Sequence, residues 1–207
     1  MAIEIFYKTV SKWKENSFIV KYNGEAWIID PGDEFLLLDK EFNIENFKIN
    51  GIVNTHGHFD HVGAVEAFKN KYSISFFIHE KDKQILRQAN LYKKLAGSTD
   101  FFTIPRVEKY IVNDDVFVLN DKNIKAHHTP GHTNGSVSFE IDNCLIIGDL
   151  FYKDTLGRVD LPGGNIDLLK KSVAFVMDHF EGFIIYPGHG APFILNNEVI
   201  NTLKKLI

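Results

Sequence analysis

Two blocks of short apolar segments, each followed by helical patterns, constrain the fold of this chain more than any other feature. The first block has strand-like runs at 3–8, 17–22, 26–30, 49–55 and 73–79, with helical patterns near 62–68 and at 80–96. The second block has five strand-like runs between 107 and 149, another at 183–187, and helical patterns at 166–180 and 197–206. Strands in two blocks favour two sheets packed together with helices outside. We therefore expect an α/β (α+β) sandwich.

The clearest helix covers residues 166–180. Its apolar side chains recur at helical spacing, with Asn165 as the expected N-cap and Gly182 as the expected stop. Asn23 to Glu25 is typical of a hairpin turn, and residues 97–106 are expected to form a loop. No composition shift divides the sequence, so residues 1–207 are expected to form one domain.

Composition and charge argue against several classes of protein. The net charge is −4 and the basic residues are scattered, which gives no footprint for nucleic acid. No apolar run approaches the roughly 20 residues that cross a membrane. Cys144 is the single cysteine, and the first residues do not resemble a signal peptide. We expect a cytoplasmic protein that acts on a small molecule; the sequence predicts no protein partner and no oligomeric state.

The segment NTHGHFDHVGA follows the apolar run at 49–55 directly. It places His56, His58, Asp60 and His61 within six positions. Four partly desolvated titratable groups packed this closely would be costly without a cation. The segment therefore indicates a metal site.

Three further side chains share one signature, because each lies near the end of an apolar strand and beside glycine. They are His132 in TPGHTNGS, Asp149 in IIGDLF and His189 in YPGHG. Ligands in sheet-based folds gather at strand ends, and glycine allows close backbone approach there. A glycine-rich stretch at 155–164 adds Arg158 to this group.

The seven side chains supply five imidazoles and two carboxylates. A catalytic first-row ion takes about three protein ligands, so seven suit two ions, with Asp149 as the expected bridge. Imidazole and carboxylate without thiolate suit Zn, with Fe or Mn as alternatives. The other four histidines are expected to be ordinary structural residues: His79, His127, His128 and His179.

At this point the motifs resemble a known family. HGHFDH is similar to the H-x-H-x-D-H motif of the metallo-β-lactamase-fold hydrolases, and the segments at 129–136, 148–149 and 187–190 resemble its later motifs in the same order. The resemblance covers residues from about 15 to 195. It implies an αββα sandwich with a two-metal site at one edge. It also implies two ligand sets joined by Asp149: His56, His58 and His132 for one ion, and Asp60, His61 and His189 for the other.

Within this family, GDLFYKDTLGRVDLPGGN is similar to glyoxalase II (hydroxyacylglutathione hydrolase). That resemblance implies a substrate-binding role for Arg158 and, more weakly, for Tyr152 and Lys153; a plain ion pair between Arg158 and Asp160 is the competing interpretation. The chain stops soon after residue 190, without the helical segment that completes glutathione binding in glyoxalase II, and so resembles its short relatives. True metallo-β-lactamases usually place cysteine or another ligand where Asp149 stands, and Cys144, five residues earlier, is expected in the core. Lactam hydrolysis is therefore not expected.

The expected reaction is hydrolysis of an acyl-thioester such as S-lactoylglutathione through a metal-bridged hydroxide. Asp60 or Asp149 would orient the nucleophile and accept its proton. A thiolate leaves easily, because the pKa of a free thiol is about 8.5.

Three alternatives remain open from the sequence. His56, His132 and Asp149 could hold one Fe(II), as in the persulfide dioxygenases of this fold family. Two-metal sites also cleave phosphate esters. A non-catalytic metal-binding or interaction module would use the same fold.

Overall fold

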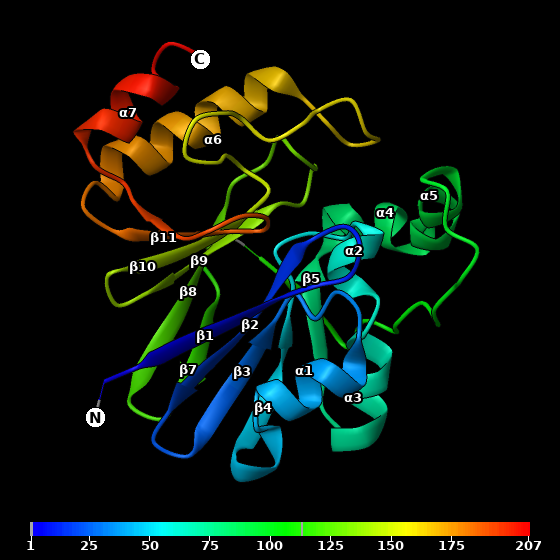
Figure 1. The fold of residues 1–207 in the computed structure, drawn as a ribbon. Coiled ribbons are helices and arrows are strands. Elements are labelled where there is room, and N and C mark those ends of the chain that lie inside the picture. The colour runs from blue at the N-terminus through cyan, green and yellow to red at the C-terminus, as the bar shows by residue number, and fades with distance from the viewer. Residues whose placement is uncertain (1, 113) are drawn as a thin grey trace.

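The computed structural model describes residues 2–112 and 114–207, which form two six-stranded sheets packed face to face, with helices on both outer faces (Figure 1). The first half of the chain builds one sheet and the second half builds the other. This arrangement confirms the expected αββα sandwich.

The first sheet has strand order β1-β2-β3-β4-β5-β6. Its strands are β1 (Glu4–Val10), β2 (Glu15–Tyr22), β3 (Glu25–Ile29), β4 (Lys48–Val53), β5 (Phe76–His79) and β6 (Lys109–Ile111). The hairpins β1-β2 and β2-β3 are antiparallel, whereas β3, β4, β5 and β6 pair in parallel. The expected turn at Asn23 and Gly24 has positive φ at both residues, which suits a two-residue hairpin.

The second sheet has strand order β12-β11-β10-β9-β8-β7. Its strands are β7 (Val116–Leu119), β8 (Lys122–His128), β9 (Val137–Ile141), β10 (Cys144–Gly148), β11 (Ile184–Pro187) and β12 (Phe193–Ile194). Among the described strands of this sheet, β10 and β11 alone pair in parallel. Both sheets are therefore mixed, and each has parallel strands that end at the same edge of the sandwich.

The helices cover the outer faces. Over the first sheet lie α1 (Phe35–Glu41), α3 (Val65–Tyr72) and a short turn, η1 (Ile44–Asn46); α6 (Ile166–His179) and α7 (Asn197–Leu203) cover the second (Figure 1). The remaining helices are α2 (Phe59–Val62), η2 (Glu80–Asp82), α4 (Lys83–Arg87) and α5 (Ala89–Leu95). Asn165 caps α6 by accepting from the Leu168 amide at 3.0 Å, as the sequence predicts. Each helix described is too short or too polar to span a bilayer.

The core has three layers, and strand β2 shows how they arise. Phe18 and Val20 face the second sheet, whereas Ile19 between them faces the helices. This alternation follows from the two-residue period of a strand. On the other side of the sandwich, Val173 and Val176 of α6 close the third layer against the second sheet.

Two local expectations differ from the structure, and some elements were not expected. Residues 80–96 form η2, α4 and α5 instead of one helix, because Gln88 leaves helical geometry (φ −98°, ψ 5°) and starts a new direction. Helix α1 and strand β12 were not expected from the sequence pattern. Cys144 is half-buried at the start of β10, so it is not a core residue.

Candidate metal centre

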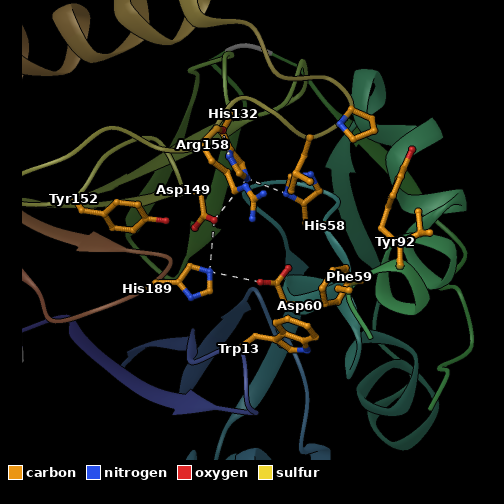
Figure 2. Close-up of a pocket in the computed structure, with 14 residues that line it drawn as sticks. Trp13, His58, Phe59, Asp60, Tyr92, His132, Asp149, Tyr152, Arg158 and His189 are labelled. Carbon is orange, nitrogen blue, oxygen red and sulfur yellow. Dashed lines mark hydrogen bonds and ion pairs between the residues drawn. The ribbon is translucent and has the colours of Figure 1, made fainter. Parts of the chain in front are cut away.

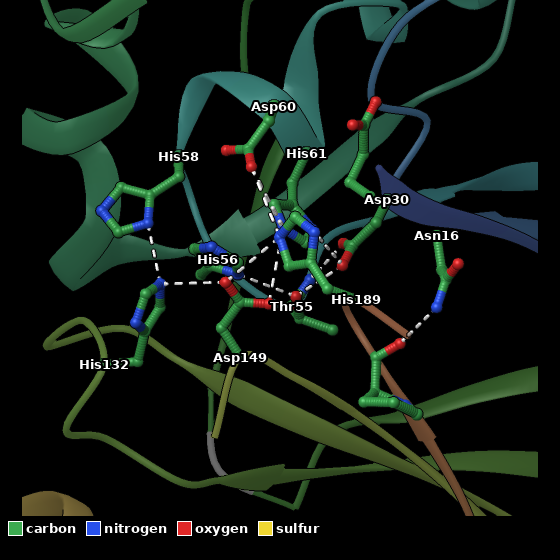
Figure 3. A network of polar contacts seen from close by, with 12 residues as sticks. Asn16, Asp30, Thr55, His56, His58, Asp60, His61, His132, Asp149 and His189 are labelled. Carbon is green, nitrogen blue, oxygen red and sulfur yellow. Dashed lines mark hydrogen bonds and ion pairs between the residues drawn. The ribbon is translucent and has the colours of Figure 1, made fainter. Parts of the chain in front are cut away.

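The parallel strands of the two sheets end at one edge of the sandwich, and all seven expected ligands lie there (Figure 3). The loop after β4 and the short α2 carry His56, His58, Asp60 and His61, and the loop between β8 and β9 carries His132. Asp149 follows β10, and His189 follows β11. Convergence of parallel strand ends is the usual reason that ligand sites form at such an edge.

Glycine is required directly after β11, where the chain passes the ligand that follows β10. A Cβ atom added to Gly188 would lie 2.1 Å from Asp149 Oδ1 and 2.9 Å from the His61 ring. Nearby, the buried Asn16 amide donates to the Pro187 carbonyl at 3.0 Å and to the Gly190 carbonyl at 2.7 Å. The backbone before His189 can therefore pass directly beside the carboxylate and is held there from β2.

One group of three imidazoles, the first triad, consists of His56, His58 and His132. Their ligand atoms lie within 4.8 Å of one another, and the three residues are at most 5% exposed. His58 Nδ1 and His132 Nε2 face each other at 2.8 Å. Three inward-facing nitrogens at this separation match the donor set of a catalytic divalent ion.

A second group, the second triad, consists of Asp60, His61 and His189, again within 4.8 Å. It is more open, because the side chain of His189 is 26% exposed and that of Asp60 is 15% exposed. His189 Nε2 lies 3.5 Å from Asp60 Oδ2. This triad therefore combines a carboxylate with two imidazoles at the edge of the solvent.

Asp149 lies between the two triads. Its Oδ1 is 3.6 Å from His61 Nε2, while its Oδ2 is 3.6 Å from His132 Nε2 and 3.5 Å from His189 Nε2. One carboxylate thus faces donors of both triads, which is the geometry expected of a bridging ligand.

Hydrogen bonds at the far side of four rings set their orientation. The Nδ1 atoms of His56, His61, His132 and His189 contact, in that order, Thr55 Oγ1 (3.0 Å), Asp30 Oδ2 (2.9 Å), the Arg158 carbonyl (2.8 Å) and the Lys14 carbonyl (3.1 Å). Each contact leaves Nε2 directed inward. Ligating histidines in proteins are held in this way, which fixes both the tautomer and the ring.

The sequence analysis missed Asp30, which follows β3 and is fully buried. Its carboxylate accepts from the Thr55 amide at 2.7 Å and contacts His61 Nδ1 at 2.9 Å. Asp30 also falls within ligand distance of His56 and His61, but these hydrogen bonds occupy its oxygens and give it an orienting role. The signal was present, because AWIIDPG ends an apolar strand with an aspartate beside Pro31-Gly32.

The sequence analysis also missed Asp82, at the end of η2 and fully buried. Its Oδ2 accepts from the Gly57 amide and the Thr133 hydroxyl, both at 2.8 Å, and its Oδ1 accepts from the Gly135 amide at 2.8 Å. One carboxylate therefore joins the loop of His56 and His58 to the loop of His132. No sequence pattern marks it, because its partners come from two sheets.

The protonation of the two triads differs. Burial lowers the pKa of His58 to about 3, and burial together with neighbouring imidazoles holds the pKa of His56 well below its usual value. Burial also lowers the pKa of His61 and His189, but nearby carboxylates outweigh it and raise these values to about 9 and about 11. Without an ion, His56 and His58 of the first triad are therefore neutral near pH 7, whereas His61 and His189 of the second triad are protonated.

Several buried atoms at the centre have no hydrogen-bond partner within the described protein. His56 Nε2, His61 Nε2 and Asp149 Oδ1 are buried and accept or donate no hydrogen bond. Buried polar atoms without partners are costly, and a cation would satisfy all three. The residues present therefore fit a divalent metal.

A cavity of about 690 Å³ opens above the candidate ligands (Figure 2). Arg158 lines it and forms a two-point ion pair with Asp160, through Nε and an Nη at 2.8 Å each, so the expected ion pair is formed at the wall of the cavity. Tyr152 also lines it, whereas Lys153 lines a neighbouring hollow.

The remaining histidines belong to neither triad. His79 and His128 stack with ring centroids 4.3 Å apart, and His127 Nε2 lies 2.6 Å from Glu140 Oε2. His179 Nδ1 donates to the Phe175 carbonyl at 2.9 Å within α6. These contacts agree with the structural roles expected for them.

Relatives by sequence cover most of the chain. An uncharacterised protein of Aquifex aeolicus is 38% identical over 170 residues, which is 81% of this chain and 79% of the relative. The hydroxyacylglutathione hydrolase GloC of Haemophilus influenzae is 28% identical over 209 residues, covering 96% and 95% of the two chains.

Solved structures share the whole fold. BLEG-1, described as a B3 metallo-β-lactamase, matches with a TM-score of 0.86 at 27% identity over 96% of this chain and 97% of its own. TTHA1623, solved in a di-iron-bound form, matches with a TM-score of 0.83 at 28% identity over 92% and 94%. The model of one family matches residues 11–199. The chain therefore belongs to the metallo-β-lactamase superfamily.

Proposed function

We propose that this chain is a two-metal hydrolase that cleaves acyl-thioesters, and that Zn fills both positions, with Fe or Mn as alternatives. The observation that carries the proposal is the position of Asp149, whose two oxygens face donors of both triads at 3.5–3.6 Å on the floor of an open cavity. Two ions there would supply Lewis acidity that activates water and stabilises negative charge on a carbonyl oxygen.

The protein's own groups divide the remaining work. Asp60 and Asp149 are kept ionised: burial alone would raise the pKa of each carboxyl, but the nearby histidines outweigh it and hold both values low. Either carboxylate can therefore hold a water molecule and accept its proton. Asp60 is the better candidate for this step, since its side chain is more exposed to the cavity than that of Asp149.

Tyr152 supplies a protonated hydroxyl at the wall of the cavity beside Asp149. Burial and the neighbouring Asp149 raise the pKa of its hydroxyl, so it stays protonated throughout the ordinary pH range. Its hydroxyl points toward Asp149 in Figure 2. We infer that Tyr152 donates to Asp149 and helps to position the substrate carbonyl.

Two observations support a thioester over other acyl compounds. The GloC relative, matched over 95% of its length, is named a hydroxyacylglutathione hydrolase. Besides the candidate ligands, the titratable side chains lining the described cavity are the phenols of Tyr92 and Tyr152 and the guanidinium of Arg158. Phenols and guanidinium groups are ordinarily poor proton donors near neutral pH. A thiolate leaving group needs little protonation, since the pKa of a free thiol is about 8.5.

The test is release of free thiol from S-lactoylglutathione and from a simple acetyl thioester by protein loaded with Zn, Fe or Mn. Asp149→Asn serves as the matched control, because it keeps the shape of the side chain. We expect turnover by the loaded protein and loss of it in the variant.

A chromogenic β-lactam and a phosphodiester are assayed in parallel. Turnover of either one without thiol release would overturn the thioester assignment while leaving the two-metal hydrolase in place. Binding of two ions without turnover of any of these substrates would favour the non-catalytic module.

A further inference from the structure

We infer that the substrate group held beside the two triads is apolar, with the size of a medium-length acyl chain or an aromatic ring. This inference rests on the proposed thioesterase function and names the class of thioester. It is carried by the composition of one side of the cavity and by the pairing of its single arginine.

The apolar side is built from four separate segments. Trp13, in the turn between β1 and β2, packs edge-on against Phe59 at the start of α2, with ring centroids 5.1 Å apart. Tyr92 and Leu95 of α5 and Leu161 of the loop after β10 complete this side. Figure 2 shows Trp13, Phe59 and Tyr92 on one side of the ligands and Tyr152 on the other.

The hydroxyl of Tyr92 on this side is already engaged. The Tyr92 hydroxyl donates to Gln88 Oε1 at 2.8 Å, which leaves its ring to face the cavity. Leu95 is 75% exposed although it is a large apolar side chain at the cavity mouth. Exposed apolar surface that continues into a cavity is typical of a binding site for an apolar group.

The charge on the cavity wall also favours an apolar group. Arg158 is the one Lys or Arg among the described lining residues, and Asp160 holds its guanidinium at two points, both 2.8 Å. Lys12 lies over the Trp13 ring at 4.8 Å but does not line the cavity. Because Asp160 already balances this charge, a substrate carboxylate would gain less from Arg158 than from an unpaired arginine, whereas an apolar group needs no charged partner.

The first experiment varies only the acyl group. Acetyl, butyryl and hexanoyl thioesters of one neutral thiol, N-acetylcysteamine, are compared by thiol release. We expect kcat/KM to rise about two- to fourfold per methylene, since fourfold corresponds to ~0.8 kcal/mol for each fully buried CH2. The total gain from acetyl to hexanoyl should be roughly 16-fold or more.

The second experiment changes the wall. Leu95→Ala is the test variant because Leu95 is exposed, so its truncation should not disturb folding. Leu95→Met, which keeps a large apolar side chain, should retain the wild-type dependence on acyl length. Leu91→Ala is the matched control, since Leu91 lies one turn earlier on α5, is 50% exposed and does not line the cavity. We expect the hexanoyl-to-acetyl ratio of kcat/KM to fall about threefold or more in Leu95→Ala alone, through KM.

A binding measurement separates this inference from the proposed function. Methyl and hexyl thioethers of the same thiol cannot be hydrolysed, so their Kd values are measured by calorimetry on wild type, Leu95→Ala and Leu91→Ala. Tighter binding of the hexyl compound that weakens only in Leu95→Ala supports the apolar site even if no thioester is cleaved. Equal Kd values and flat kcat/KM across the acyl series would overturn the inference, even if thioesters are cleaved well.

Discussion

The first and second triads offer an ion different donors. The first triad consists of three deeply buried imidazoles, two of which, His56 and His58, have strongly lowered pKa values. The second triad pairs a carboxylate with His61 and His189, whose pKa values are raised to about 9 and about 11. The first is thus ready to accept a cation, while the second must first lose protons.

This difference teaches what each triad contributes. Neutral imidazoles bind an ion with little change in their protonation, so the first triad should fill first and hold its ion more tightly. The second triad lies nearer the solvent, includes the negative charge of Asp60 and lies next to that of Asp149. An ion there should exchange more readily and respond to pH.

The largest effect is expected from Asp149→Asn, which should weaken both positions. Removing a group that only orients a ligand typically lowers metal affinity or activity by about 10–100-fold. Removing a shared ligand should therefore lower kcat/KM by more than roughly 100-fold. Metal content after dialysis should fall below one ion per chain. Retention of two ions would contradict the bridging role.

A pair of variants, one from each triad, should separate the two positions. His189→Gln should leave about one ion per chain, held by the first triad, whereas His58→Gln should release the more tightly held ion. Metal analysis during stepwise chelation gives the two off-rates. Identical behaviour of the two variants would show that the triads act as one unit.

Lowering the pH should empty the second position before the first. Below pH 9 both His61 and His189 carry protons when no ion is bound, so binding releases up to two protons and affinity falls by up to about 100-fold per pH unit. The pKa of His58 is about 3, so protonation of His58 does not lower the metal affinity of the first position above about pH 4. Metal content measured from pH 8 to pH 5 should pass through a plateau near one ion. Loss of both ions together would refute the ordering.

The smallest effects should come from the two buried aspartates that orient ligands. Asp30→Asn should weaken the second position by about 10–100-fold, because it contacts His61, while Asp82→Asn should weaken the first by a similar factor. Titration with Co(II), followed by absorbance, can assign each loss to one position. The same loss at both positions in either variant would indicate general loosening of the fold.

The fold was predictable because strand and helix periods are local properties of the sequence. Helix 80–96 was not predicted correctly, since its break at Gln88 serves tertiary contacts: Asn90, just after the break, donates to the Phe102 carbonyl at 2.8 Å. Four of the candidate ligands could be named from the density of titratable residues in NTHGHFDHVGA, and the other three from strand ends beside glycine. Asp82 could not, because its three partners meet only when both sheets are packed.

Arg158 shows a second limit. The sequence left open a substrate-binding role and an ion pair with Asp160, and the structure contains the ion pair within the wall of the cavity. Its main-chain carbonyl, which contacts His132, could not be read from residue type. Two of the four contacts that orient the histidine rings are made by main-chain carbonyls, those of Lys14 and Arg158. Such contacts cannot be predicted from residue type, because every residue has a main-chain carbonyl.

The candidate ligands are divided between the halves of the chain: four follow β4 in the first sheet, and three belong to the second sheet. An ion held by His56, His58 and His132, or shared through Asp149, would therefore act as a removable cross-link between the two faces of the sandwich. Binding energy would count toward folding, because the unfolded chain has no such site. The supply of metal in the cell would then govern how long the folded protein survives, as well as whether it is active.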